Sequence, residues 1–115
     1  MPTKKLPKPI ETVAAGLKFR TPEDRARAAR LVKGELLLLE REPENAHDPN
    51  AIKILTIDGY REDCRHIGYV PSVVAREIAP MLDSGVELSC TVVTVVDYVE
   101  RVPMVAIIIE DVSEP

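Results

Sequence analysis

Two apolar runs joined by a polar turn dominate the middle of the chain. The first run covers residues 36–41 and the second residues 51–57, with charged and turn-forming residues between them. Short apolar runs bounded by turn residues are typical of β-strands rather than helices. The Asp58-Gly59 pair that closes the second run is a further turn signal. This stretch therefore predicts two consecutive strands, the first of them buried on both faces.

The rest of the chain continues the pattern. Strands are expected near residues 12–20, 35–42, 51–57, 66–70, 86–97 and 104–110, where β-branched runs alternate with turn signals. Aromatic residues make up only 3% of the sequence, so the core must consist mainly of Val, Ile, Leu and Ala, with Cys90 as a small core residue. We predict a mainly β fold, a small OB-like antiparallel barrel of about six strands with one or two short helices.

Two helices are expected. Thr21 can cap a helix that has Pro22 in its first position, carries Ala28 and Val32 on its inner side, and ends at Gly34. A second helix starts near residue 72, with Val74, Ile78 and Leu82 facing the core and Gly85 after its end. Pro80 should break or kink this helix, because proline lacks an amide hydrogen and clashes with the preceding turn.

The length of the chain, 115 residues, suits one domain. We expect that domain to span residues 10–112, with tails at 1–9 and 113–115. The sequence has no signal peptide and no apolar run of membrane-spanning length, which favours a cytoplasmic protein without a membrane partner.

Charge is unevenly distributed along the chain. The formal net charge is −4, which argues against binding driven only by phosphate neutralisation. Residues 4–33, however, carry nine basic and three acidic side chains, a net charge of +6. A negatively charged partner would therefore approach the N-terminal third.

Two sequence blocks, Arg-Glu-Pro…Asp-Pro-Asn-Ala-Ile (residues 41–52) and Ile-Gly-Tyr-Val-Pro (residues 67–71), resemble the signature of the HIRAN domain in order and spacing. This β-rich module occurs alone in bacteria and phages and at the N-terminus of some eukaryotic DNA-remodelling helicases. The resemblance covers roughly residues 12–110. It implies a modified barrel with a helix packed on it, and recognition of the 3′ end of single-stranded DNA.

Asp48 is the central site candidate. From its residue type it can be a turn residue in Asp48-Pro49-Asn50, and Asn50 is expected to be structural. The resemblance implies instead that Asp48 accepts a hydrogen bond from the 3′-hydroxyl, a role that suits a carboxylate because it would repel a terminal phosphate. His47 stands where the family most often has a Tyr that stacks on the terminal base, and imidazole stacks with less area.

Four more residues complete the expected DNA-binding set. Lys18 and Phe19 match the family's basic–aromatic pair on the first strand, as a phosphate contact and a second stacking face, although Phe19 can equally be a core residue. Tyr69 takes a position near the bound nucleotide or is a half-buried structural Tyr. Ser72 opens a helix whose free amides can receive a phosphate.

No catalytic constellation is visible. The sequence has no Ser–His or Cys–His pair in a motif context and no Gly-rich phosphate loop, and Cys64 and His66 lack a second pair to complete a zinc site. We therefore expect a non-enzymatic module without metal or cofactor, acting in DNA repair or replication-fork processing through a helicase or nuclease partner. The alternative is a protein-interaction or regulatory module on the same barrel with a degenerate nucleotide pocket, which the acidic net charge and His47 favour.

Overall fold

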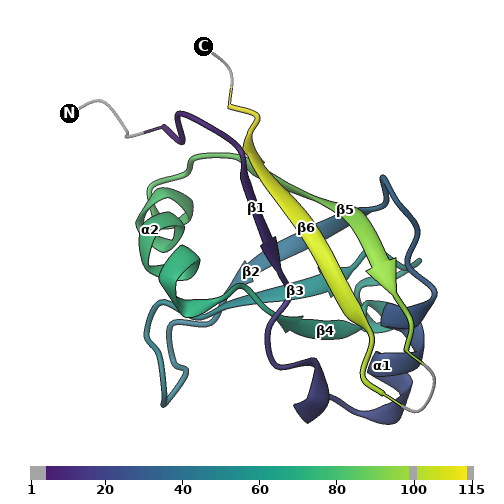
Figure 1. Ribbon diagram of the computed structural model, residues 1–115. Helices are drawn as coiled ribbons and strands as arrows, with labels where there is room; N and C mark the ends of the chain where they lie inside the picture. The colour runs from purple at the N-terminus through teal and green to yellow at the C-terminus, as the bar shows by residue number, and fades with distance from the viewer. Residues whose placement is uncertain (1–4, 99–100, 114–115) are drawn as a thin grey trace.

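The computed structural model describes residues 5–98 and 101–113. Within these residues the chain forms a six-stranded sheet in which all strand pairs are antiparallel and the strand order is β1-β6-β5-β2-β3-β4. The strands are β1 (Ile10–Val13), β2 (Leu36–Arg41), β3 (Ile52–Thr56), β4 (His66–Tyr69), β5 (Leu88–Val96) and β6 (Met104–Asp111). The sheet curls until its first and last strands meet (Figure 1) at an isolated bridge between Ala15 and Tyr69. This curled OB-like half-barrel confirms the predicted fold class.

Aliphatic side chains fill the inside of the curled sheet. Fully buried isoleucines come from β3, β4, β6 and the second α-helix, and Cys90 of β5 is buried among them as predicted. The segment before β1 also contributes, because Leu6 is buried and its backbone N–H donates to Asp111 Oδ2 at 3.0 Å. The expected tails fall partly outside the described residues, at 1–4 and 114–115.

The first helix, α1 (Pro22–Ala29), begins as predicted, with Thr21 Oγ1 accepting the backbone N–H of Asp24 at 3.1 Å. It ends earlier than Gly34, however, because the N–H groups of Arg30 and Leu31 turn back onto carbonyls of the last helical turn. Val32 lies beyond this end and is exposed instead of packed.

The second helix, α2 (Ser72–Asp83), covers the side of the barrel at the left of Figure 1. Ile78 is buried, and Val74 and Leu82 pack against the core, as predicted. Of the predicted break or kink at Pro80, the break is wrong, since the helix continues to Asp83. Pro80 lies on the exposed side of the helix, where water can bind the carbonyl that loses its amide partner.

Two strand predictions also need correction. Residues 17–19 do not extend β1 but form a 3-10 turn, η1 (Leu17–Phe19), because Gly16 adopts a left-handed conformation with φ of 77° and redirects the chain. β2 is not buried on both faces: Leu37 points inward, whereas Leu36 and Leu38 are exposed. A curled sheet without a second layer over this strand buries only one of its faces.

The remaining short element, η2 (Arg61–Asp63), lies between β3 and β4. The predicted turn before it is present, with Gly59 at a positive φ of 42°. The backbone of Ala15 passes close to Gly68 of β4. Gly68 has φ of 151°, and a Cβ at this position would lie 2.7 Å from the carbonyl oxygen of Ala15. Only glycine fits this close backbone approach, because any side chain at position 68 would collide with Ala15.

Candidate nucleic-acid interface

The loop between β2 and β3 is organised by the side chain of Asn45. Asn45 Oδ1 accepts the backbone N–H groups of His47 at 2.8 Å and Asp48 at 3.0 Å. Asn45 Nδ2 donates to Glu42 Oε1 at 2.6 Å. A single amide side chain thus holds the backbone of both predicted site residues in the loop, as Asx turns do.

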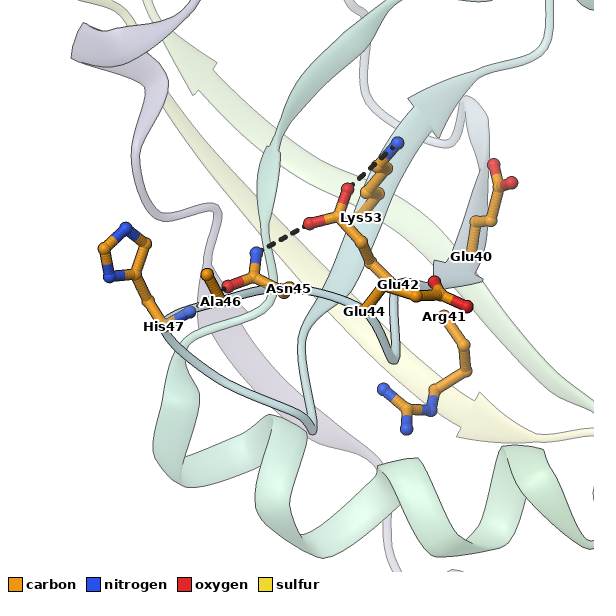
Figure 2. Close-up of a pocket in the computed structure, with 8 residues that line it drawn as sticks. All are labelled: Glu40, Arg41, Glu42, Glu44, Asn45, Ala46, His47 and Lys53. Carbon is orange, nitrogen blue, oxygen red and sulfur yellow. Dashed lines mark hydrogen bonds and ion pairs between the residues drawn. The ribbon is translucent and has the colours of Figure 1, made fainter.

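Glu42 is the charged centre to which this loop is tied (Figure 2). Its Oε1 also accepts the Tyr69 hydroxyl at 2.9 Å, and its Oε2 pairs with Lys53 Nζ at 3.1 Å. The hydrogen bond from Asn45, followed by those from Lys53 and Tyr69, lowers the pKa of Glu42 to about 2 against the desolvation that opposes it. Glu42 is therefore ionised at neutral pH and connects the loop to β3 and β4.

Tyr69 is held on three sides. Its hydroxyl donates to Glu42, its ring meets the edge of His66 with 4.7 Å between ring centroids, and its backbone exchanges two hydrogen bonds of 2.8 Å with Ala15. Partial burial and the negative charge of Glu42 raise the pKa of the Tyr69 phenol. A neutral phenol ring is thereby fixed beside the loop.

Asp48 serves the turn with only part of its carboxylate. Asp48 Oδ1 accepts the backbone N–H of Asn50 at 2.8 Å, and the Asp48 carbonyl accepts the N–H of Ala51 at 3.0 Å. Among the described residues, no donor binds Asp48 Oδ2. The predicted turn role is real, and it leaves one carboxylate oxygen for a ligand.

Arg41 anchors the C-terminal part of the loop. Its guanidinium donates to the carbonyls of Ala51 at 2.8 Å and Pro49 at 2.9 Å, and it pairs with Asp83 at the end of α2 at 2.9 Å. Hydrogen bonds from an arginine to carbonyls and a carboxylate restrict the loop to one geometry. The loop is therefore fixed at both ends, by Asn45 with Glu42 and by Arg41.

These elements line an open surface cavity of about 440 Å³. Its lining includes four of the six predicted site residues, His47, Asp48, Tyr69 and Ser72. The other lining residues are Ala15, Asn45, Ala51 and Val70. Ser72 is the first residue of α2, and its N-cap, Pro71, provides no side-chain cap for the free amides. The cavity therefore offers an aromatic face, a carboxylate oxygen and backbone donors, in a volume typical of small-ligand sites.

Lys18 and Phe19, the other two predicted residues, do not line this cavity. They lie in η1, three and four residues after Ala15. Phe19 is 78% exposed, so its interpretation as a core residue is wrong. Lys18 Nζ lies 5.0 Å from the centroid of the Phe19 ring, a cation–π contact at the surface.

The HIRAN domain family model matches residues 9–104. The chain belongs to the HIRAN domain family. The HIRAN domain is a DNA-binding module.

Relatives show the same domain in larger proteins. The chain is 37% identical over 75 residues to a Fanconi-associated nuclease 1 homolog of Oryza sativa subsp. japonica, and 34% identical over 74 residues to a homolog of the same name from Arabidopsis thaliana. Each match covers 64% of this chain but only 7% of the relative. The chain thus spans a small part of the relatives that it matches.

Two solved structures share the fold. The crystal structure of the HIRAN domain of human HLTF has a TM-score of 0.63 at 18% identity, covering 88% of this chain and 72% of that one. A protein from Lactobacillus plantarum has a TM-score of 0.65 at 20% identity, covering 90% of this chain and 99% of that one. At these identities the likeness concerns the fold.

A second cavity of about 510 Å³ lies on the same loop of this HIRAN domain (Figure 2). Its lining includes Glu40, Glu42 and Glu44 together with Arg41 and Lys53. Both basic groups have carboxylate partners, Arg41 with Asp83 and Lys53 with Glu42. This side of the loop is therefore unfavourable for a phosphate.

The buried cysteine of the HIRAN domain, Cys90, does not have the surroundings of a reactive thiol. Cys64 and Cys90 are free, and burial raises the pKa of the Cys90 thiol to about 12. Across residues 5–98 and 101–113, no cluster of three His, Cys, Asp or Glu side chains could hold a metal ion. In that same part of the chain, no helix has the length and apolarity to cross a bilayer.

The sequence did not predict the network behind the site. Glu42 and Tyr69 are 27 residues apart, and only the folded sheet shows that they meet. Asn45 did carry a local signal, since an Asn three residues before an Asp-Pro turn is a frequent acceptor of loop amides.

Proposed function

We propose that this HIRAN domain binds the 3′ end of single-stranded DNA and has no catalytic activity of its own. The observation that carries the proposal is the convergence of His47, Asp48, Tyr69 and Ser72 on one cavity, with Asp48 Oδ2 unoccupied by any donor of the described residues. The terminal base stacks on His47 and Tyr69, and the 3′-hydroxyl donates to Asp48.

The carboxylate supplies the end specificity. A free hydroxyl donates to Asp48 Oδ2, whereas a 3′-phosphate brings negative charge against it and offers no donor at neutral pH. The amides at the start of α2 receive a phosphodiester near the end, and Lys18 and Phe19 contact the strand where it leaves the cavity.

The expected affinity is modest. One or two stacked bases contribute roughly 1–3 kcal/mol each, and a charge-assisted hydroxyl bond adds about 1.5–3 kcal/mol. Together these contributions, at most about 9 kcal/mol, reach only about the micromolar range of dissociation constants. In the cell we place the domain in DNA repair or replication-fork processing, beside a nuclease or helicase, because both curated relatives are named as nucleases.

The decisive experiment compares short oligonucleotides that differ only at the 3′ terminus. Fluorescence anisotropy should give at least tenfold weaker binding for the 3′-phosphate than for the free hydroxyl. Asp48→Ala should weaken binding of the hydroxyl form and shrink this difference. A variant that melts as a folded protein and retains the full hydroxyl preference would show that Asp48 is only a turn residue.

The second candidate function is a protein-interaction module with a degenerate nucleotide cavity. The three glutamates of the neighbouring cavity and the net charge of −4 favour it. The same titration discriminates the two, because this alternative requires no measurable binding of either oligonucleotide.

A further inference from the structure

A third surface cavity, of about 660 Å³, is lined by residues of η1 and α1 and by residues that follow β5 and precede β6. The cavity of about 440 Å³ lined by His47, Asp48, Tyr69 and Ser72 is called the 3′-end cavity. The charged residues that line the third cavity are Lys18 of η1, Arg25 of α1, Arg101 just before β6 and Asp97 just after β5. The remaining lining consists of prolines, alanines and a valine. We call it the basic groove, since three cations face one carboxylate on an otherwise acidic chain.

The cations of this groove differ from most others in the fold. Arg20, Arg27, Arg41, Lys53, Arg61 and Arg65 each form an ion pair with a carboxylate. By contrast, Lys18, Arg25 and Arg101 pair with no carboxylate of the described residues. Lys18 rests over the Phe19 ring, and Arg25 donates to the carbonyl of Arg20. No ion pair within the described residues therefore competes with a phosphate for these three charges.

The groove is also close to the 3′-end cavity. Ala15 lines that cavity and Lys18 lines the groove, and three residues span at most about 10 Å. The intervening η1 turn exposes Phe19 (the purple turn at the bottom of Figure 1). An aromatic ring followed by a basic groove is the arrangement that single-strand binders use to carry a backbone.

We infer that the basic groove binds the phosphodiester backbone of the strand whose 3′ end occupies the neighbouring cavity. The strand runs from the cavity over η1, and its phosphates 5′ of the terminal nucleotides contact Arg25 and Arg101. This inference rests on the proposed function and adds to it a path for the strand and a preference for length.

The test uses a ten-nucleotide and a three-nucleotide strand, each with a free 3′-hydroxyl. The double variant Arg25→Gln/Arg101→Gln should bind the long strand about tenfold more weakly and the short strand unchanged. For the long strand, a plot of log K against log salt concentration should be less steep for the double variant than for wild type. The slope should differ by about 1.4, because two phosphate contacts are lost. The control, Lys8→Gln/Lys33→Gln, removes the same charge from exposed lysines that line neither cavity, and it should change neither strand's binding beyond a small uniform loss.

Two further measurements separate phosphate contact from other causes. A long strand with neutral methylphosphonate linkages 5′ of the last two nucleotides should bind wild type and the double variant equally. Asp97→Asn, which removes the groove's carboxylate, should tighten binding of the long charged strand, an outcome that misfolding cannot produce.

The groove inference would be overturned if the groove variant and the control variant lost equal affinity for the long strand. If both still preferred the free 3′-hydroxyl, the proposed function would remain intact. Loss of affinity by the double variant for the neutral strand would also overturn the groove inference. Absence of binding by the wild-type chain to either strand would overturn the proposed function and this inference with it.

Discussion

The substitution Glu42→Gln best tests the contacts of Glu42 with Asn45, Lys53 and Tyr69, which hold the candidate site together. Gln keeps the size of the side chain and still accepts from Tyr69, but it removes the charge that Asn45 and Lys53 bind. The lowering of the Glu42 pKa from 4.5 to about 2 corresponds, without solvent screening, to about 3 kcal/mol of unfolding free energy. Because the Glu42 side chain is 24% exposed, solvent screening reduces the expected loss of unfolding free energy to about 1 kcal/mol.

The loss should depend on pH in a defined direction. The pKa of Glu42 is lower in the folded protein, so its charge stabilises the fold fully above pH 4.5 and progressively less as the pH falls toward 2. Urea unfolding of wild type and Glu42→Gln should thus differ by about 1 kcal/mol at pH 7 and pH 5, and by much less at pH 3.

Glu44→Gln is the matched control, since Glu44 lies in the same loop, is exposed, and binds no other described residue. It should leave stability within about 0.5 kcal/mol of wild type at each pH. An equal effect of the two substitutions, or an effect of Glu42→Gln that is the same at pH 7 and pH 3, would refute the reasoning.

Three other substitutions give simpler outcomes. Phe19→Ala should leave the thermal midpoint nearly unchanged, because the ring is exposed, and weaken binding of single-stranded ends by about tenfold; normal binding would remove Phe19 from the interface. His47→Tyr should tighten that binding through a larger stacking face, and an equal or lower affinity would contradict the stacking role. Gly68→Ala should destabilise the domain by about 2–3 kcal/mol, because its new Cβ meets the Ala15 carbonyl at 2.7 Å, and an unchanged melting curve would contradict that contact.

Local signals in the sequence located most elements of the fold. The cap of α1 depends on Thr21 and Pro22, which act over three residues, and the strand boundaries follow turn residues such as Gly59. The predictions failed where the conformation of a single residue ends a strand, or where the position of a strand in the fold decides which of its faces is buried. Gly16 turns the chain out of β1, and nothing in the run 36–39 reveals that only one face of β2 is covered.

The candidate site divides in the same way. His47, Asp48 and Tyr69 were predicted from the two sequence blocks, and Ser72 from the helix start that follows the second block. The fold brings these four residues to one cavity. The partners that hold them could not be predicted, because Glu42 reaches Tyr69 across β3 and Arg41 reaches Asp83 at the end of α2. The domain bounds at 10 and 112 stay a prediction.

The bridge between Ala15 and Tyr69 has a consequence for solubility. β1 and β4 are the two edge strands of the sheet, and free edges can pair with strands of other molecules and start aggregation. The two backbone hydrogen bonds of the bridge bind one edge to the other where they meet. The contact that fixes Tyr69 beside the loop therefore also covers part of a template for edge-to-edge association, so substitutions that open it should promote aggregation.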